Sequence, residues 1–175
     1  VAIGSDALAS TTVNGQNVAV GHEALTANTS SWNTAVGYRA LTANTTGQYN
    51  TSVGHSALDN NTTGSGNAAF GHRTLNANTT GLQNTALGYQ TMSSNTIGQM
   101  NTSTGGFSTF LNVEGNENTA DGYYALFYNR AGSRGTAIGA HALRYANSTA
   151  VPFTNENVAI GYEALHGSNV APANT

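Results

Sequence analysis

Small, apolar and polar positions recur along the whole chain in units of about 17 residues. A typical unit holds Asn, a small or β-branched residue, Ala or Ser, an apolar residue and Gly, with Ala-Leu close behind. The ten marker glycines are separated by 17, 16, 17, 17, 17, 17, 17, 17 and 22 residues, and they are Gly4, Gly21, Gly37, Gly54, Gly71, Gly88, Gly105, Gly122, Gly139 and Gly161. Such a short, regular period predicts a solenoid, in which each repeat forms one coil that buries its apolar side against its neighbours.

A single repeat, residues 33–49, favours strands over a helix. Gly recurs in every unit, Thr and Asn are plentiful, and apolar residues do not recur at i, i+3, i+4 and i+7 over three turns. We therefore predict two short strands in this coil, one over Thr34–Val36 and one around Ala40–Thr42. Gly37 and Gly47 are expected at corners, where a positive φ or a close backbone approach would penalise a Cβ.

Three columns of residues are expected to run along the stack of coils. The first holds only Ala and Ser: Ala2, Ala19, Ala35, Ser52, Ala69, Ala86, Ser103, Ala120, Ala137 and Ala159. The second is larger and apolar, with Thr104 and Asp121 as interruptions: Ile3, Val20, Val36, Val53, Phe70, Leu87, Ile138 and Ile160. The third suits the inside of a coil: Leu8, Leu25, Leu41, Leu58, Leu75, Met92, Leu126, Leu143 and Leu165.

The first two columns cannot face the same core, because successive residues of a strand point to opposite sides. One of them needs a second partner, since a contiguous apolar stripe on the outside is a liability for a monomer. We therefore predict self-association, with three chains around one axis preferred over a closed dimer.

Composition favours a stiff extracellular fibre over an enzyme. Only 7% of the residues are charged, Lys and Cys are absent, and a formal net charge of −3 gives no basic surface for nucleic acid. No stretch approaches about 20 apolar residues, so no membrane insertion is predicted for this segment. Because the chain starts without Met inside a repeat, we expect residues 1–175 to be one repeat array from a longer fibre.

Several phrases resemble known fibre repeats. They are Asn33-Thr-Ala-Val-Gly-Tyr, Asn84-Thr-Ala-Leu-Gly-Tyr and Asn157-Val-Ala-Ile-Gly-Tyr, joined by Asn-Thr-Thr-Gly linkers. They are similar to head repeats of trimeric autotransporter adhesins, and closer still to the 17-residue repeats of phage-tail-fibre-like proteins, which often precede a self-cleaving intramolecular chaperone. The resemblance implies a homotrimeric, left-handed parallel β-roll (a β-solenoid) of about ten coils, displayed on a cell surface or virion tail fibre. It implies very little about binding chemistry, because such fibres carry different receptor sites in different proteins. A host or prey surface glycan is the partner expected for the adhesive segment. No chaperone lies in this chain, so autoproteolysis is not predicted.

The position after the marker Gly is often a flat ring: His22, Tyr38, His55, His72, Tyr89, Tyr123 and Tyr162. Rings one coil apart, at about 4.8 Å, predict a stacked ladder that covers a corner of the solenoid. The alternative is a track that binds sugar, because aromatic faces pack on carbohydrate. The three His residues lie on separate coils without a recurring second ligand, so no metal site is predicted.

Asp121 replaces a Val or Ile of the apolar column, one coil after Thr104. If this column faced a trimer axis, three carboxylates would converge and recruit a cation or water cluster. The alternative is that the column is exposed at this coil.

Regularity fails in coils 101–134 and in an inserted loop, 144–156. The pattern slips by one residue at Gly105 and Gly106, and rings then accumulate; the insertion accounts for the 22-residue spacing. Loops in a rigid repeat scaffold often carry binding functions. The candidate receptor or glycan contacts are Tyr123, Tyr124, Tyr128, Tyr145, Phe153 and Glu156, and the alternative is a packing bulge against a neighbouring chain.

Asn-Thr-Thr or Asn-Thr-Ser, each of which matches the N-glycosylation acceptor pattern, begins at Asn28, Asn44, Asn50, Asn61, Asn78 and Asn101. Their periodic recurrence favours turn chemistry instead, in which Asn adopts an unusual φ and Thr hydroxyls satisfy backbone groups.

Catalytic triads, paired carboxylates at a matched spacing and phosphate-binding loops are absent from the sequence, so neither an enzyme nor a cofactor is predicted. The preferred function is a structural and adhesive fibre segment. One alternative is an ice-binding solenoid, suggested by a column that Val18 and Ala68 interrupt: Thr34, Thr51, Thr85, Thr102, Thr119 and Thr136. The other alternative is a mechanical spacer or filament without a ligand.

Overall fold

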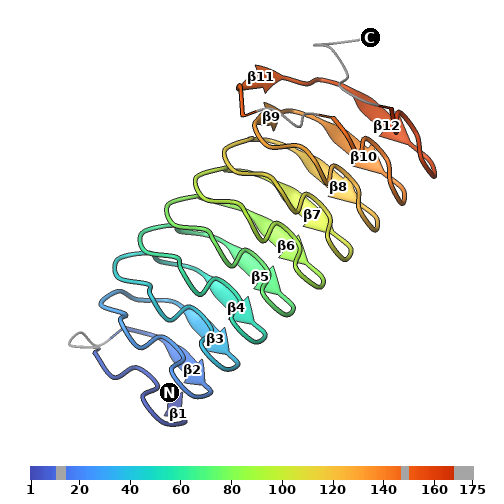
Figure 1. The fold of residues 1–175 in the computed structure, drawn as a ribbon. Helices are drawn as coiled ribbons and strands as arrows, with labels where there is room; N and C mark the ends of the chain where they lie inside the picture. The colour runs from blue at the N-terminus through green and yellow to red at the C-terminus, as the bar shows by residue number, and fades with distance from the viewer. Residues whose placement is uncertain (11–14, 147–149, 168–175) are drawn as a thin grey trace.

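The computed structural model describes residues 1–10, 15–146 and 150–167, and these form a parallel β-solenoid that contains no helix (Figure 1). Ten strands make one parallel sheet in chain order, and a second, two-stranded sheet pairs β11 with β9. The strands are β1 (Ala2–Ile3), β2 (Val18–Val20), β3 (Thr34–Val36), β4 (Thr51–Val53), β5 (Ala68–Phe70), β6 (Thr85–Leu87), β7 (Thr102–Thr104), β8 (Thr119–Asp121), β9 (Gly132–Ser133), β10 (Thr136–Ile138), β11 (Phe153–Thr154) and β12 (Val158–Ile160). The predicted β-solenoid with a period of about 17 residues is therefore confirmed.

Equivalent residues of successive repeats pair with one another. In β3 and β4, Thr34 lies opposite Thr51, Ala35 opposite Ser52, and Val36 opposite Val53. The predicted strand Thr34–Val36 is thus correct, and identical columns are brought side by side along the sheet.

The second predicted strand, around Ala40–Thr42, is wrong, because these residues form turns. Arg39 and Leu41 have φ values of 52° and 56°, in the left-handed region and far from an extended strand. Hydrogen bonds between coils nevertheless continue, since the Leu41 N–H donates to the Ala57 carbonyl at 3.0 Å. Stacking of coils and burial of Leu41 therefore hold a conformation that few side chains adopt by themselves.

Both predicted corner glycines lie where a side chain cannot fit. Gly37 has a φ of +134°, and an added Cβ would lie 2.5 Å from the Gly54 carbonyl oxygen of the next coil. Gly47 has no positive φ, but its Cβ would lie 2.3 Å from the Gly64 carbonyl oxygen. The marker glycines therefore set how closely the coils can approach.

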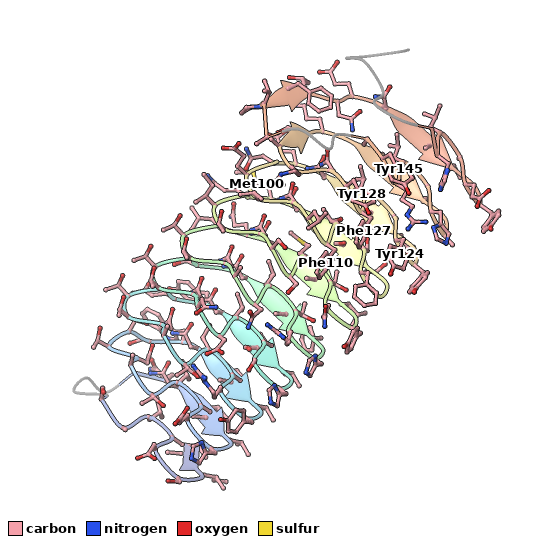
Figure 2. The ribbon with its side chains drawn as sticks, viewed as in Figure 1. Met100, Phe110, Tyr124, Phe127, Tyr128 and Tyr145 are labelled. Carbon is pink, nitrogen blue, oxygen red and sulfur yellow. The ribbon has the colours of Figure 1, made fainter. Side chains whose placement is uncertain are left out.

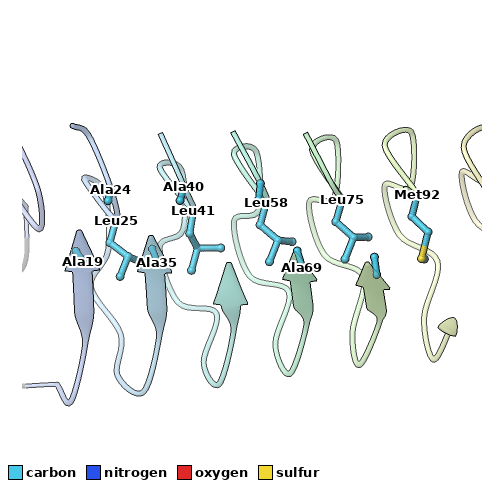
Figure 3. Close-up of a cluster of buried hydrophobic side chains, with 12 residues drawn as sticks. Ala19, Ala24, Leu25, Ala35, Ala40, Leu41, Leu58, Ala69, Leu75 and Met92 are labelled. Atoms are coloured by element: carbon cyan, nitrogen blue, oxygen red, sulfur yellow. The ribbon is translucent and has the colours of Figure 1, made fainter. Parts of the chain in front are cut away.

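The apolar interior is thin and consists of one large side chain and small residues in each coil (Figure 3). The leucine column and the small column both point inward and are fully buried at most coils: Ala19, Leu25, Ala35, Leu41, Leu58, Ala69, Leu75, Ala86 and Met92. The small column therefore has a packing role, because only Ala or Ser leaves room for Leu on the facing turn.

A polar coil divides this interior into two apolar clusters, one before and one after it. The buried Ser103 hydroxyl lies 2.8 Å from the Ser108 hydroxyl and 2.9 Å from the Thr109 hydroxyl. Thr109 occupies the leucine column here, between Met92 and Leu126. These hydroxyls satisfy one another, so the coil is polar inside without leaving its groups unpaired.

Two ladders of buried asparagines run beside the apolar interior. In the first ladder, the Asn50 N–H donates to Asn33 Oδ1 at 3.0 Å, and its side-chain amide donates to the Gly64 carbonyl at 2.8 Å. In the second, Asn61 Nδ2 donates to Asn44 Oδ1 at 2.8 Å and to the Gly64 carbonyl at 3.0 Å. Each of these side-chain amides thus bonds the asparagine one repeat earlier, and both amides share the Gly64 carbonyl.

The asparagine ladders correct the interpretation of the N-glycosylation acceptor pattern, in which Asn was expected to adopt an unusual φ. The asparagines of the six Asn-Thr-Thr and Asn-Thr-Ser sequences are buried, and none has a positive φ: Asn28, Asn44, Asn50, Asn61, Asn78 and Asn101. The expectation for Thr is confirmed, because the Thr45 hydroxyl donates to the Thr62 carbonyl and the Thr62 hydroxyl to the Thr79 carbonyl, both at 3.0 Å. A glycan on the folded chain is therefore excluded at these six asparagines.

The backbone keeps its register through coils 101–134. Thr104 of β7 lies opposite Asp121 of β8, and the Gly105 N–H donates to the Leu87 carbonyl at 2.9 Å. Part of the inserted loop forms β11, in which Phe153 lies opposite Gly132 of β9. Residues 147–149 of that loop lie outside the described residues.

Candidate interaction surfaces

The outer face of the ten-stranded sheet is formed by the first and third residues of each three-residue strand. The middle residue of each is buried, whereas the flanking residues are half-buried or exposed. This is the expected opposition of the small and apolar columns. The outer face therefore carries two columns, one rich in Thr and one rich in large apolar side chains.

The apolar column of the outer face remains accessible in the single chain. Leu87 is 53% exposed and Ile160 is 68% exposed, and Phe70 and Ile138 are exposed as well. These residues lie in register along the sheet, so they form a stripe and not scattered single residues. Accessible apolar stripes of this length mark surfaces that bind another molecule.

The Thr column lies beside this stripe. Thr85, Thr102 and Thr119 pair in succession, and Thr136 continues the column on β10. Their side chains are exposed or half-buried. The interruption at Ala68 falls between Thr51 and Thr85, as the pairing shows.

Asp121 lies on the outer face and is exposed. The Thr104 hydroxyl donates to Asp121 Oδ1 within the same column, so the two polar residues satisfy one another across adjacent strands. Together they make a polar step in the apolar stripe.

A ladder of stacked rings covers the turns that follow β2 to β6, so the expected ladder is confirmed for these five coils. Tyr123 and Tyr162, which were expected to continue it, meet neighbouring rings edge to face instead. His22, Tyr38, His55, His72 and Tyr89 stack in order, with successive ring centroids 5.4, 4.9, 5.1 and 5.2 Å apart. His22 and His55 are exposed and His72 is half-buried. The regular ladder thus rigidifies one edge of the solenoid.

The ladder changes at Phe107, where Tyr89 meets the next ring edge to face, at 71° between the ring planes. The ring now stands two residues after the marker Gly instead of one, so the slip seen in the sequence moves the side chain while the strands stay paired. Phe107 then stacks on Tyr124, and Tyr124 on His141 with an angle of 2° between planes.

Beyond this change the rings form a wider cluster (Figure 2). We define the ring cluster as Phe107, Phe110, Tyr123, Tyr124, Phe127, Tyr128 and Tyr145, which are joined by direct ring contacts. Tyr128 and Tyr145 stack at 4.8 Å, and Tyr124 lies 4.6 Å from Phe127. The cluster gathers four of the six residues predicted as receptor contacts.

Arg144 brings a positive charge to the ring cluster. Its guanidinium lies 4.8 Å from the centre of the Tyr124 ring and 5.4 Å from that of Tyr145. Its Nη1 donates to His141 Nδ1 at 3.2 Å, because a guanidinium can only donate, while its buried Nε has no hydrogen-bond partner among the described residues. Cation–π contacts, and not a carboxylate, surround this guanidinium.

Tyr123 lies at the exposed side of the cluster, with its ring centre 4.3 Å from that of Tyr124. A hydrogen bond with Tyr124 raises the pKa of Tyr123 above its ordinary value of 10.0. The Tyr123 hydroxyl therefore stays protonated at neutral pH, with its proton directed to Tyr124.

The other two predicted contacts lie elsewhere. Phe153 belongs to β11 and packs on β9, and Glu156 forms an ion pair with Arg134 at 3.6 Å. Both lie on the coil segment that precedes a strand of the large sheet, whereas the ring cluster lies on the turns that follow strands. The six predicted residues therefore form two groups instead of one site.

Two shallow hollows lie on the segments that precede the strands. One, of about 360 Å³, is lined by Ile97, Glu114 and Pro152 among others. The other, of about 320 Å³, is lined by Tyr49, Ser65, Gly66, Leu82 and Gln83. The sequence offers one signal for the second hollow, since Gly66 takes a place that carries a side chain in neighbouring repeats.

Within the described ranges, no three His, Cys, Asp or Glu side chains gather in a way that could hold a metal ion. The same ranges contain no helix that is long and apolar enough to cross a membrane.

Comparison of the chain with protein-family models, curated protein sequences and solved structures gives no match. The β-solenoid is therefore established by its own geometry, and the resemblance to adhesin and tail-fibre repeats depends on the repeat phrases themselves.

Proposed function

We propose that this chain is a structural and adhesive segment of an extracellular surface or tail fibre. Three copies pack around one axis through their outer faces, and the assembled solenoid presents a rigid scaffold for attachment to glycans or other surface receptors. No catalytic role is part of the proposal.

The main support is the accessible apolar stripe on the outer face. The interior of each coil is already filled by the leucine and small columns, so the large side chains on the outer face have no partner inside the described chain. Burying them against equivalent stripes removes about 25 cal/mol of unfavourable hydration per Å² of apolar surface. A second copy is the natural occupant, because its sheet carries the same stripe at the same coil spacing, with the same polar step at Thr104 and Asp121.

The ring cluster supports the adhesive part of the proposal. Its Tyr rings offer flat faces for the C–H surface of a sugar. Arg144 adds a cation that suits a carboxylate-bearing sugar.

The decisive experiment is the solution mass of the folded chain by light scattering. The parent chain is expected to give three times the 17.9 kDa monomer mass. A double variant, Val36→Asp with Val53→Asp, places charges in the stripe and is expected to give the monomer mass with an unchanged circular dichroism spectrum.

A matched control adds the same two charges elsewhere. Thr46 and Thr63 are exposed on a turn away from the sheet, so Thr46→Asp with Thr63→Asp should keep the parent mass. A monomeric parent chain, or an assembly that the stripe variant leaves intact, would refute the self-association.

The alternative of ice binding has one specific support. Thr85, Thr102, Thr119 and Thr136 lie outward in register on an exposed sheet, at the spacing of the coils. The neighbouring column is bulky and apolar and contains Asp121, which breaks the regular hydroxyl array. Thermal hysteresis in a dilute solution of the monomeric stripe variant would favour this alternative. The alternative of a mechanical spacer predicts that no part of the chain binds a glycan.

A further inference from the structure

A second column of side chains runs along the segments that precede the strands. The ring ladder, in contrast, lies on the turns that follow the strands. We define the slot column as Trp32, Tyr49, Gly66, Gln83 and Met100, each of which comes directly before a ladder asparagine. All five have positive φ values, between 55° and 70°. Backbone bonds fix their stacking, since the Gly66 N–H donates to the Gln48 carbonyl at 2.9 Å and the Gln83 N–H to the Ser65 carbonyl at 3.0 Å. In Figure 2, Met100 marks this column, apart from the labelled rings of the ring cluster.

The slot column begins with a rigid aromatic pair. The Trp32 and Tyr49 rings are 5.0 Å apart and within 3° of parallel. One face of Tyr49 is thus covered, while the side chain as a whole remains 59% exposed. The open face of Tyr49 points along the column toward the next coil.

The next position of the column is empty because residue 66 is Gly. A side chain would have room there, since the nearest atoms to an added Cβ all belong to Gln83, and the closest, Cγ, lies at an ordinary contact distance of 3.4 Å. The other members of the column carry side chains at similar φ values, so the backbone conformation does not require Gly. The gap is the hollow of about 320 Å³ between Tyr49 and Gln83, bounded also by Ser65 and Leu82.

The dimensions of this gap fit one flat ring. Rings in this column stack one coil apart, and Gln83 lies two coils beyond Tyr49, so a space one ring thick remains over Gly66. We propose that this slot binds a neutral pyranose, whose C–H face stacks on Tyr49 while its hydroxyls bond the Gln83 amide and the Ser65 hydroxyl.

The chemistry of the lining selects this class of ligand. Tyr49 and Leu82 supply apolar surface, Gln83 and Ser65 supply polar edges, and none of the five lining residues carries a carboxylate, guanidinium or amine. A charged sugar or a nucleotide phosphate would find no counter-charge there, whereas an uncharged sugar needs none. The slot thus differs from the ring cluster, where Arg144 favours an acidic group.

The slot lies within one chain, so this proposal deepens the adhesive part of the proposed function without requiring the trimer. Light scattering on the same samples reports assembly separately from binding. A failure of sugar binding in the slot is therefore distinguishable from a failure of trimer assembly.

The test is saturation-transfer NMR on the full chain with methyl glycosides of glucose, galactose and N-acetylglucosamine, and with adenosine for comparison. Transfer to ring protons of at least one glycoside is expected, together with a change in the fluorescence of Trp32, the one tryptophan of the sequence. Two variants should reduce the transfer at least about tenfold, Tyr49→Leu by removing the stacking face and Gly66→Gln by filling the slot.

Met100→Gly is the matched control. It opens a gap of the same kind in the same column, but beside Gln83 and Glu117 and without a ring, so glycoside transfer should match that of the parent chain. Absence of transfer with every glycoside, transfer that Gly66→Gln leaves unchanged, or preference for adenosine would each overturn the proposal.

Discussion

The inner and outer faces of the large sheet are made by alternating residues of the same strands, yet they accept very different side chains. The inward position varies only between Ala and Ser in ten copies, and it is buried in every three-residue strand. The outward position of the third strand residue ranges from Val to Phe, Thr and Asp. The interior therefore specifies the coil, while the outer face can change its interactions without changing the fold.

Substitution of a corner glycine should give the largest loss of stability. An added Cβ at Gly54 would lie 2.4 Å from the Gly71 carbonyl oxygen, at a φ of +136°. Gly54→Ala is therefore expected to cost at least about 3 kcal/mol, measured as a lower melting temperature by circular dichroism. Gly66→Ala is the control, with no backbone clash and a φ of +70°, and should cost only about 1 kcal/mol. Equal losses in the two variants would contradict the role assigned to the corner.

Substitution of a ladder asparagine should give the next largest loss of stability. Asn61→Ala leaves the buried Asn44 side-chain oxygen without a partner. It also removes one of two hydrogen bonds from the Gly64 carbonyl and from the Asn78 amide, so we expect a cost of about 3 kcal/mol in urea unfolding. The neighbouring Asn60 is exposed, so Asn60→Ala should change stability by less than about 0.5 kcal/mol. If both variants unfolded at the same urea concentration, the buried hydrogen bonds of the ladder would contribute no more to stability than an exposed asparagine does.

The comparison of the two faces is sharpest at adjacent residues of β3. Ala35→Val adds two methyl groups to a filled interior and should cost about 2 kcal/mol. Val36→Thr keeps the shape of a half-buried outward side chain and should cost less than about 0.5 kcal/mol in the fold itself. Melting temperatures of the two variants check this order, and its reversal would show that the faces were assigned the wrong way round.

Substitution of a ring in the exposed ring ladder should give the smallest loss of stability. His55 stacks between Tyr38 and His72, at 4.9 and 5.1 Å. His55→Ala is expected to cost about 0.5–1 kcal/mol, and His55→Phe should restore most of it, because the flat face and not the imidazole is needed. Calorimetric melting of the three chains measures the difference; no rescue by Phe would point to a polar role instead.

The sequence predicts the repeat period, the strand and the opposition of the two columns, because these follow from alternation alone. The turn at Ala40–Thr42 could not be predicted in the same way. Arg39 and Leu41 adopt left-handed φ values that neither residue favours, and bonds to adjacent coils together with the burial of Leu41 stabilise them.

The asparagine ladders are also not predicted from the sequence, because Asn is common in turns. A signal was present in the regular return of Asn33, Asn50, Asn67 and Asn84 at one position while neighbouring polar residues vary. Of the candidate site, the sequence predicts the accumulation of rings in coils 101–134, which include Tyr124 and Tyr128. It does not predict that Tyr145 joins these rings while Phe153 and Glu156 lie apart, because this depends on the path of the inserted loop.

The parallel stacking of coils also has a mechanical consequence. Strands β1 and β12 lie at opposite ends of the stack, and the bonds between coils run along its long axis (Figure 1). A pull between those ends therefore stretches one layer of bonds at a time and does not shear all of them together. Each 17-residue coil that detaches releases about 58 Å of extended chain in place of one strand spacing of about 4.8 Å. Under tension the molecule would lengthen in discrete steps and dissipate energy at each one, while the coils still stacked keep their shape.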